Sequence, residues 1–476
     1  MKDRRDFLKK SIGAVTFFAA HRMLANGAGY VEGPLRAFNL KTAIEEDLYH
    51  YSPANNGAGP MWGHGMTTVV RSGDDIFARG LETVPGVEGL SNCRWLLFKR
   101  YGSGWKLEAK DLVNLTREPC SLAVYDSETV LLSANPKQAD SCVEYCLTHP
   151  EILSFDRKNP HFPYQRLIPQ WKNNPGFNDH SYRAFAADPK NRELILFQNY
   201  MYHHAEWTYL DSNGKWSASG AVKWPLETYA GKEVPLRLCY SNVAIRDRKV
   251  FFFATADVVE PVEEWKNYKL ELTGAKWDYV FRRLFFSWSD DISKGQFQPW
   301  VEIANRDKTA GNIRNQDLWL SPDGRVYLLW TEKAIDERLR EKFFPDEKQE
   351  HAIHCAIVAD GKIQRRVTIL SSKEGESETL VPGTARFQAT PDGRLFVVYY
   401  VSGSRADGSK ISENRIAEID KNGRVGRSVT VPFKKPFITF QTANERAGCE
   451  PSDWLDIIGG QEDKPGTISY ASVRIN

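Results

Sequence analysis

Residues 180–210, HSYRAFAADPKNRELILFQNYMYHHAEWTYL, contain the pattern on which the fold depends. Residues 184–187 form a short, mostly apolar run, the turn-forming residues 188–191 follow, and residues 194–197 are again apolar. Two apolar runs joined by a polar turn predict a tight β-hairpin. Because its second run is apolar at every position, we expect that strand to be buried on both faces.

The same hairpin pattern returns along the chain. The further copies are residues 66–81, 121–134, 242–256, 317–331, 387–400 and 455–475. Two turns are nearly identical, since SPDGR at 321–325 corresponds to TPDGR at 390–394. With the first example this makes seven hairpins at intervals of roughly 50 to 75 residues, longer than the repeats of compact propellers.

Weaker strand patterns lie between the hairpins, at residues 95–105, 207–216 and 284–300. Four strands per unit, repeated seven times, can close into a ring in which each sheet buries both faces. The sequence therefore predicts an all-β, seven-bladed β-propeller with four-stranded blades over residues 30–476. A pair of β-sandwiches is the alternative, but it does not explain why the hairpin pattern continues to the last residues.

Length, composition and charge limit the possible classes. A chain of 476 residues exceeds the ~250 to 300 over which one core keeps growing, so several domains or a repeated architecture is needed. Its 14 Trp, 19 Tyr and 25 Phe, with 34 Gly and 24 Pro, are typical of short strands joined by turns. The 63 Lys and Arg nearly balance the 61 Asp and Glu. This balance indicates neither a nucleic-acid partner nor a membrane surface, so any preference for anions must be local.

The first 29 residues predict an export signal. Arg4 and Arg5 open a twin-arginine motif, and residues 12–20 form a short apolar stretch. That stretch is too short to span a bilayer, and no later segment is long and apolar enough. We therefore expect a periplasmic or secreted protein; a basic cytosolic tail is the alternative.

The cysteines do not predict a metal site. Seven cysteines are scattered along the chain, and of these Cys142 and Cys146 could pair in an oxidising compartment. No zinc-like or EF-hand-like spacing is present, so neither a metal nor a cofactor is expected. The sequence does not indicate an oligomeric state.

A propeller would bring polar side chains from distant hairpins together. The first strand of each hairpin would line the axis, and its start would share one face of the ring with the end of its partner strand. Residues at the strand starts are His64, Arg117, His180, Arg183, Arg237, Tyr240, Arg314, Arg386 and Asp453; those at the strand ends are Glu82, Asn135, Tyr202, His203, His204, Asp257 and Glu332.

Two long insertions belong to the same predicted face. Residues 258–283 carry Trp265, Tyr268, Trp277 and Tyr279, whereas residues 332–344 have the helical spacing of Ile335, Leu339 and Phe343. Aromatic walls above charged groups suit a carbohydrate, whose ring faces stack while its hydroxyls form hydrogen bonds. The alternative is that these aromatic residues pack the core.

The predicted cluster suggests chemistry on an anionic sugar. Several arginines bind a carboxylate or sulfate, and histidine and tyrosine can exchange protons with a substrate. Together they suit β-elimination from a uronic acid, in which arginine neutralises the carboxylate, a base removes the C5 proton and an acid protonates the leaving oxygen. The structural alternative for His64 is a hydrogen bond to the glycine-rich loop of residues 55–65.

The chain resembles exported BNR-repeat, sialidase-like propeller proteins, and segments 211–216 and 289–300 resemble worn Asp-box turns. In layout it is similar to ulvan lyases and related rhamnose-glucuronate lyases. This resemblance implies His180, His203 or His204, and Tyr240 as the catalytic groups. It also implies Arg183, Arg237 or Arg314 at the carboxylate. The chain departs from the pattern at Asp257, where a basic group is expected, and His64 with Glu82 could form a second arrangement.

Three functions remain open: a polysaccharide lyase, a glycoside hydrolase of the sialidase-like or rhamnosidase-like kind, and a glycan-binding propeller without catalysis. A hydrolase could use two carboxylates among Glu82, Asp257, Glu332 and Asp453, or a tyrosine with a glutamate. In each case the expected partner is an anionic oligosaccharide or polysaccharide. The predicted site residues are His64, His180, His203, His204 and Tyr240 for catalysis, and Arg117, Arg183, Arg237, Arg314, Arg386, Tyr202 and Glu332 for substrate binding.

Overall fold

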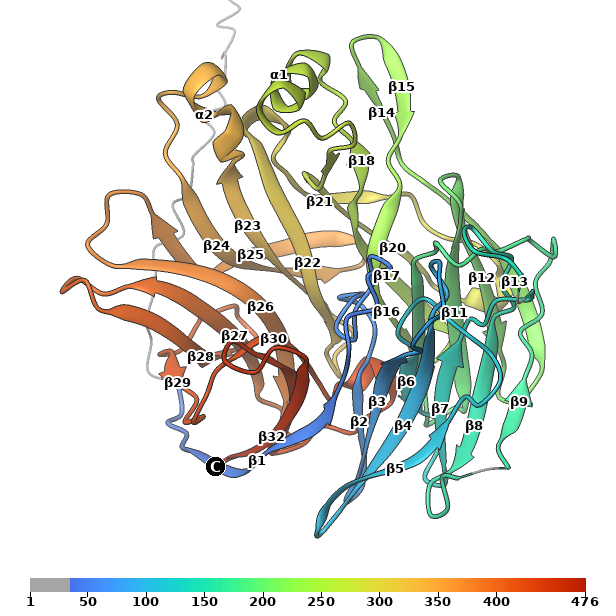
Figure 1. Ribbon diagram of the computed structural model, residues 1–476. Coiled ribbons are helices and arrows are strands. Elements are labelled where there is room, and N and C mark those ends of the chain that lie inside the picture. Colours follow the sequence, from blue (N-terminus) through green and yellow to red (C-terminus); the bar gives the residue numbers. More distant parts are fainter. Residues whose placement is uncertain (1–34, 140, 162) are drawn as a thin grey trace, which may run out of the picture.

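Seven four-stranded antiparallel sheets surround one axis in the computed structural model, which describes residues 35–139, 141–161 and 163–476 (Figure 1). The innermost strands contact their neighbours from β2 and β6 round to β30, and β30 contacts β2 again. This confirms the predicted seven-bladed propeller and excludes the pair of β-sandwiches. The predicted export signal lies outside the described residues.

The first three blades follow one another along the chain, and the longest connection inside their sheets is residues 135–150, between β7 and β8 of blade 2. Blade 1 consists of β2 (Val69–Ser72), β3 (Asp75–Thr83), β4 (Cys93–Tyr101) and β5 (Gly104–Lys110), from the axis outward. Blade 2 consists of β6 (Ser121–Val124), β7 (Thr129–Ala134), β8 (Glu151–Asp156) and β9 (Gln165–Leu167). Blade 3 consists of β10 (Arg183–Asp188), β11 (Glu193–Tyr200), β12 (His204–Leu210) and β13 (Trp216–Lys223).

Blades 4 to 6 have the same order from the axis outward. Blade 4 consists of β16 (Leu238–Arg246), β17 (Lys249–Ala256), β20 (Arg283–Ser289) and β21 (Val301–Asn305). Blade 5 consists of β22 (Ala310–Leu320), β23 (Val326–Ile335), β24 (Glu350–Ala359) and β25 (Lys362–Lys373). Blade 6 consists of β26 (Thr379–Ala389), β27 (Leu395–Ser404), β28 (Lys410–Ile419) and β29 (Val429–Thr430).

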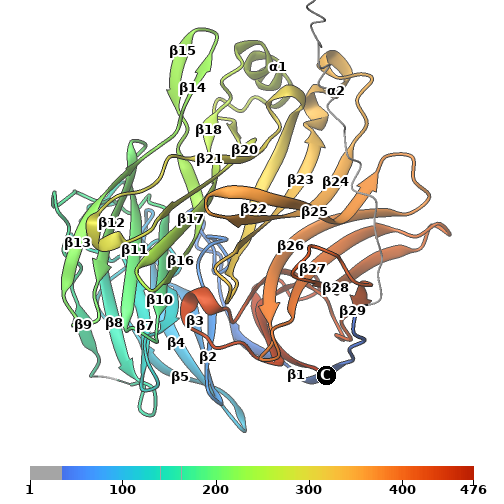
Figure 2. The same ribbon diagram turned by 180° about the vertical axis from the view of Figure 1, so that it is seen from behind.

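Blade 7 closes the ring with strands from both ends of the chain. It consists of β30 (Phe437–Thr442), β31 (Trp454–Gln461), β32 (Thr467–Ile475) and β1 (Leu40–His50). The C-terminus therefore lies beside β1, as Figures 1 and 2 show. Antiparallel pairing of β1 with β32 ties the start of the propeller to its end and leaves no gap in the ring.

The hairpin prediction is correct for the inner two strands of six blades and wrong in its placement for the seventh. The last predicted hairpin is β31 with β32, and the inner strand β30 was missed because the longer connection of residues 443–453, instead of a tight turn, follows it. Asp453 consequently precedes a second strand, so it lies on the face opposite to the one predicted. There it pairs with Arg474 at 3.1 Å.

Apolar strands make this fold stable because each blade packs against both neighbours. Phe197 of blade 3 and Phe252 of blade 4 are both buried, and their ring centroids are 5.0 Å apart. The predicted double-sided burial of β11 is confirmed, since every residue of that strand except Tyr200 is buried. At the turns between the two inner strands of blades 5 and 6, Gly324 and Gly393 have φ angles of 87° and 81°, which the two PDGR turns require.

The axis is blocked at the face where the inner strands end. The 3-10 helix η3 (Glu445–Ala447) lies in the connection between β30 and β31 and contacts β6, β10, β16 and β22. Its Arg446 is buried and donates to Asp317 at 2.9 Å. η3 therefore separates this end of the axis from the opposite face, called the upper face below.

The upper face carries the insertions, which stand at the top of Figure 1. They are the hairpin β14 (Leu226–Tyr229) with β15 (Lys232–Pro235), the helices α1 (Glu263–Thr273) and α2 (Glu337–Phe343), and the short pair β18 (Val258–Val259) with β19 (Tyr279–Val280). The 3-10 turns η1 (Ile292–Lys294) and η2 (Asp307–Thr309) complete the described elements of blade 4 and its link to blade 5.

The predicted helix at 332–344 is real but shorter than its spacing suggested. Ile335 ends strand β23, and only Leu339 and Phe343 of the three predicted apolar positions belong to α2. Trp265 of α1 packs its ring against Phe343 at 6.4 Å, so part of the aromatic content holds the two insertions together. Helix α1 was not predicted.

Candidate functional site

The site is built on a glycine-rich loop that runs from the end of β1 across the upper face to the axis. Residues 51–68 form this loop, called the axial loop below. Four arginines from different blades bind its carbonyls: Arg117 donates to Asn56 at 3.0 Å, Arg79 to Pro60, Arg386 to His64 at 3.2 Å and Arg446 to Gly65 at 2.8 Å. These guanidinium groups satisfy buried carbonyls that the loop could not pair by itself.

Gly65 allows the axial loop to touch the backbone of blade 4. A Cβ atom at this position would lie 1.7 Å from the carbonyl oxygen of Ser241. Any residue other than glycine would therefore displace either the axial loop or the segment around Ser241. This close approach places His64 beside Tyr240, and their ring centroids are 5.2 Å apart.

Aromatic rings surround the histidine. Trp62 of the axial loop stacks on Tyr182 with centroids 5.3 Å apart, and Tyr182 meets Tyr240 edge-on at 4.9 Å. Tyr240 has a φ of 54°, an uncommon conformation for a residue with a side chain, and Asn315 holds its carbonyl at 2.6 Å. The strained backbone turns the Tyr240 ring towards His64, and strain of this kind is frequent at functional sites.

The guanidinium of Arg314, from blade 5, lies near this cluster. Arg314 is exposed, and no side chain among the described residues forms a hydrogen bond or salt bridge with it. Burial, with Arg386 and Arg314 nearby, lowers the pKa of His64 to about 3, so this imidazole is neutral at pH 7. Burial raises the pKa of Tyr240 to about 12, so its phenol is protonated. The site thus combines a neutral base, a protonated acid and an unpaired cation.

A second polar group lies beside these rings. Arg237 and Tyr182 both donate to Oδ2 of Asp257, the latter at 3.0 Å, and all three groups are at least half-buried. The ring of Tyr202 lies 4.1 Å from the Arg237 guanidinium and that of Tyr279 lies 5.3 Å from it. Burial raises the pKa of Asp257 despite the arginine beside it.

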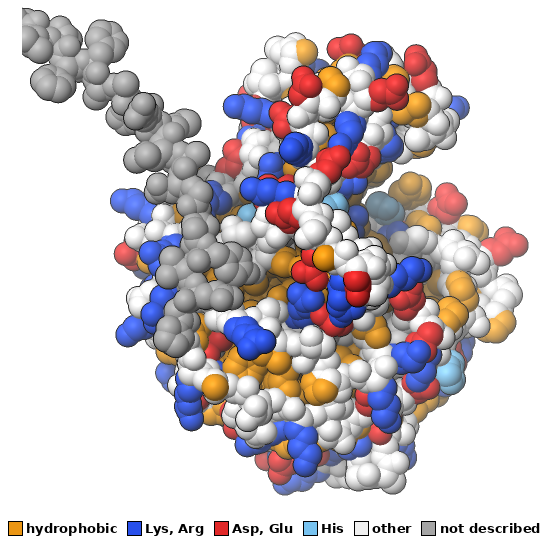
Figure 3. Space-filling view, turned by 90° about the vertical axis from the view of Figure 1, so that its left-hand side faces the viewer, with side chains coloured by type: hydrophobic (Ala, Val, Ile, Leu, Met, Phe, Trp, Pro, Cys, Tyr) orange, Lys and Arg blue, Asp and Glu red, His pale blue; other side chains and the backbone are white. Residues whose placement is uncertain are grey.

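A pocket of about 660 Å³, called the crater below, opens between these groups and blades 5 to 7. The residues that line it include His64, Arg314, Lys333, His351, Pro382 and Thr384. Figure 3 shows the surface hollowed beneath the overhanging insertions, with charged side chains along the edges. The volume is within the range of small-molecule sites.

Six of the predicted residues lie in or near the crater. His64, Arg314 and Glu332 line it, Tyr240 contacts His64, and Tyr202 contacts Arg237. Glu332 is held by Arg306 at 2.6 Å and by the indole of Trp330 at 2.8 Å, so its carboxylate already has partners.

Other predicted arginines are enclosed by protein. Arg183 is buried and donates to the carbonyls of Pro119 and Ser133, and Arg386 is buried against Gln316, Gln441 and His64. Arg117 binds the axial loop and lies 5.4 Å from the Trp62 ring. These side chains support the backbone around the site and do not line the crater.

The other three predicted histidines lie on blade 3 or in the segment just before it. His203 is exposed, and His204 bonds to Glu206 at 2.8 Å. Among the described residues both imidazoles lie against the ring of Tyr200 instead of Tyr240 or His64. His180 is half-buried two residues before Tyr182. Burial, with Arg117 and Arg237 nearby, lowers its pKa to about 4. Because Tyr182, two residues further on, contacts Tyr240, His180 belongs to the same region of the upper face.

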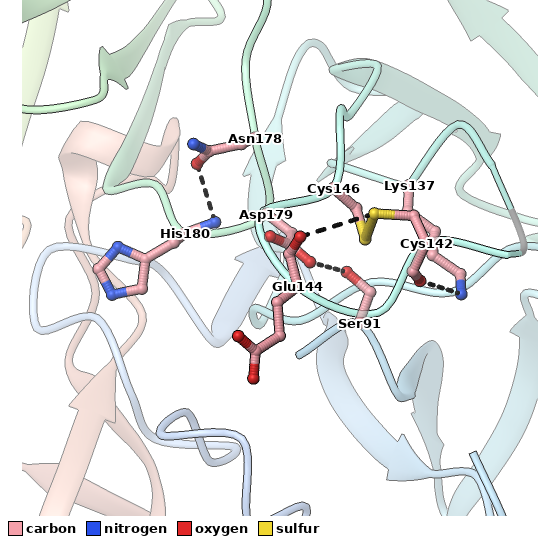
Figure 4. Close-up of a disulfide and its surroundings, with 8 residues drawn as sticks. All are labelled: Ser91, Lys137, Cys142, Glu144, Cys146, Asn178, Asp179 and His180. Carbon is pink, nitrogen blue, oxygen red and sulfur yellow. Dashed lines mark hydrogen bonds between the residues drawn. A yellow bond between two sulfur atoms is a disulfide. The ribbon is translucent and has the colours of Figure 1, made fainter. Parts of the chain in front are cut away.

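A disulfide supports the segment before His180. Cys142 and Cys146 are bonded, and Asp179 donates its backbone N–H to the carbonyl of Cys146 at 2.9 Å. Figure 4 shows the His180 imidazole pointing away from this bridge, while Ser91 donates to Asp179 behind it at 2.9 Å. The bridge thus fixes the backbone from which His180 projects.

Four residues of the site were not predicted: Trp62, Tyr182, Lys333 and His351. Trp62 and Tyr182 each stand two positions from a predicted histidine, in MWGHG and HSYR, so the local sequence carried a signal. Lys333 and His351 gave none, because their closeness depends on the pairing of β23 with β24.

Neither a metal centre nor a membrane helix is found in the described part of the chain. No cluster of three or more His, Cys, Asp or Glu side chains there has the arrangement of a metal site. No helix within the same ranges has the length and apolar content needed to cross a bilayer.

Comparisons with known proteins show only distant similarity. No family model and no curated protein matches the chain. Among solved structures, it is similar to an α-L-arabinanase of Penicillium chrysogenum, with 10% identity, a TM-score of 0.41 and coverage of 91% of this chain and 98% of that one.

An α-L-arabinofuranosidase of Fusarium graminearum gives 11% identity, a TM-score of 0.42 and the same two coverages, 91% and 98%. A sialidase of Trypanosoma rangeli gives 11% identity and a TM-score of 0.36, with coverage of 78% and 58%. At TM-scores below 0.5 these similarities carry no functional argument, so function is derived from the site itself.

Proposed function

We propose that this protein is an exported carbohydrate-active enzyme that cleaves a uronate-containing glycan by β-elimination in the crater. The observation that carries the proposal is that exposed Arg314 faces His64 and Tyr240 without a counter-ion among the described residues. Its guanidinium would bind the uronate carboxylate, and this bond would withdraw electrons from C5 and acidify the proton there.

His64 would then remove the C5 proton, the C4–C5 double bond would form, and the bond from C4 to the glycosidic oxygen would break. Tyr240, which its raised pKa keeps protonated, would give its proton to that oxygen. A bound carboxylate beside His64 would offset the nearby arginines, which raises the pKa of the imidazole and makes it a better base.

The adjacent rings of His64 and Tyr240, 5.2 Å apart, would approach the sugar from one side. That arrangement suits syn elimination, in which the C5 proton and the oxygen on C4 lie on the same face of the ring, as they do in a 4-linked glucuronate. Export is supported by the twin-arginine sequence at Arg4 and Arg5 and by the Cys142–Cys146 disulfide, which an oxidising compartment favours.

A glycoside hydrolase is the second candidate, because Tyr182 donates to Asp257 at 3.0 Å beside Arg237. A tyrosine next to a carboxylate could act as a nucleophile. Two features weigh against it: burial raises the pKa of Tyr182 far above its usual range, and Asp257 already binds Arg237. Moreover, the carboxylates lining the crater, namely Glu332, Asp336 and Glu337, are each paired with an arginine.

The deciding experiment follows ultraviolet absorbance while the protein acts on glucuronate-rich glycans. β-Elimination creates a double bond conjugated to the carboxylate, so absorbance should rise together with new reducing ends. New reducing ends without absorbance would contradict the lyase and favour the Tyr182–Asp257 hydrolase. Neither signal, with retained glycan binding, would favour the non-catalytic propeller.

A further inference from the structure

Blade 5 presents two cations side by side to the crater. Arg314 on β22 is paired with Thr331 on β23, and Lys333 lies two residues further along that strand. Residues directly opposite in an antiparallel pair, and residues two apart in one strand, project from the same face of the sheet. Arg314 and Lys333 therefore both project towards blade 6, where Pro382 and Thr384 form the facing wall.

The pairing of charges in the crater singles out these two residues. Five other charged side chains line it, and each forms a salt bridge: Arg282 with Glu260, Glu332 with Arg306, Asp336 and Arg338 with one another, and Glu337 with Arg340. Within residues 35–139, 141–161 and 163–476, neither Arg314 nor Lys333 has a salt bridge. The lining thus carries two uncompensated positive charges.

Neighbouring like charges on paired strands destabilise a sheet, and a protein retains such an arrangement where a ligand compensates it. His351 is paired with Lys333 across β23 and β24, so its imidazole joins the same face. Burial and the nearby Lys333 lower the pKa of His351, which leaves a neutral ring able to donate one hydrogen bond.

We propose that Lys333 and His351 form a second anion subsite next to Arg314, which binds an anionic group on the sugar adjoining the uronate. The inference rests on the proposed function for the identity of the ligand as a glycan. A carboxylate or a sulfate ester would fit the same chemistry, because the lysine acts as a point charge and the imidazole donates to any oxyanion. The preferred substrate is therefore a glycan with negative charges on consecutive sugars.

The test measures binding of three synthetic disaccharides by titration calorimetry at low salt. All contain glucuronate; its neighbour is neutral in the first, carries a carboxylate in the second and a sulfate ester in the third. We expect wild-type protein to bind at least one doubly charged ligand about 10-fold more tightly than the neutral-neighbour ligand. Comparison of the second and third ligands identifies the anion.

Lys333→Gln should remove that advantage and leave affinity for the singly charged ligand unchanged, and His351→Gln should remove part of it. Lys362→Gln is the matched control, because Lys362 is exposed at the outer turn between β24 and β25 on the same blade. Equal losses for all three ligands in Lys333→Gln, or no loss, would overturn the subsite.

Binding and turnover separate this inference from the proposed reaction. Preference for the doubly charged ligands without any rise in absorbance would support the subsite and contradict β-elimination. Absorbance with no preference for the doubly charged ligands in wild-type protein would support the reaction and reject the subsite.

Discussion

Arg386 of blade 6 donates a hydrogen bond to the backbone carbonyl of His64, with 3.2 Å between the two atoms. The two residues are separated by 322 positions in the chain. Gln441 of blade 7 donates to the same carbonyl at 3.1 Å. The position of the crater histidine thus depends on side chains that are remote in the sequence, and the buried arginines act by binding the carbonyls of the axial loop.

Arg386→Gln should destabilise the protein and displace His64. Its guanidinium also donates to the carbonyls of Gln316 and Ala385, and a buried carbonyl left without a donor costs about 1 to 3 kcal/mol. Urea denaturation should show the lower free energy of unfolding, and turnover should fall with it. Arg427→Gln, at an exposed position of the same blade region, is the control and should change neither.

Substitutions at the proposed catalytic groups should lower activity without unfolding the protein. His64→Ala and Tyr240→Phe should each reduce kcat about 10²- to 10⁴-fold, the usual contribution of a general base or acid. Arg314→Gln should reduce kcat/KM about 10- to 100-fold through loss of a charge-assisted bond. Circular dichroism verifies folding, and Arg365→Gln at an exposed position of β25 is the control. Full activity in Tyr240→Phe would refute the assignment of the acid.

Stability should fall as the pH is lowered below about 6.5. The folded state lowers the pKa of His64 to about 3 and that of His180 to about 4, so the unfolded chain takes up protons first. The contribution of the neutral His64 and His180 rings to the free energy of unfolding is fully present above the usual histidine pKa. It is lost progressively as the pH falls towards 4. Urea midpoints at pH 7 and pH 4.5 measure the loss.

His64→Gln should reduce this pH dependence, since the substituted side chain does not titrate. His203→Gln serves as the comparison, because the His203 side chain is exposed. An unchanged difference between the two midpoints in His64→Gln would show that His64 is not held neutral by the fold.

The sequence was sufficient to predict the propeller because its inner hairpins are encoded locally, by apolar runs on either side of a short polar turn that contains Asp. It was insufficient at β30, whose connection to β31 contains η3 instead of a tight turn. The sequence predicted that arginines at the strand starts would come close together in space. It did not predict which of these arginines would be enclosed by protein. Arg386 stands four residues before its TPDGR turn, whereas Arg314 stands seven residues before SPDGR. Arg386 therefore lies deeper along its strand and is buried, while Arg314 lies nearer the upper face and is exposed.

Thiol labelling should distinguish the cysteines. Cys93, Cys120, Cys239, Cys355 and Cys449 are free and buried, whereas Cys142 and Cys146 are bonded. In native protein almost no thiol should therefore react with a labelling reagent. Denatured protein should react at five cysteines, and denatured and reduced protein at seven. Seven reactive thiols without a reductant would exclude the disulfide in the protein as isolated.

Two glycines of the axial loop provide the most direct test of how the site is assembled. At Gly65 a Cβ atom would lie 1.7 Å from the Ser241 carbonyl oxygen, whereas at Gly59 no atom lies within 4 Å of the added Cβ. Gly65→Ala should thus push the axial loop away from blade 4 and separate His64 from Tyr240, so kcat should fall by at least about 10²-fold. Gly59→Ala should retain wild-type turnover and thermal stability. Because both variants add one methyl group to the same loop, equal activity in the two would mean that catalysis does not depend on the contact between the axial loop and the backbone beside Tyr240.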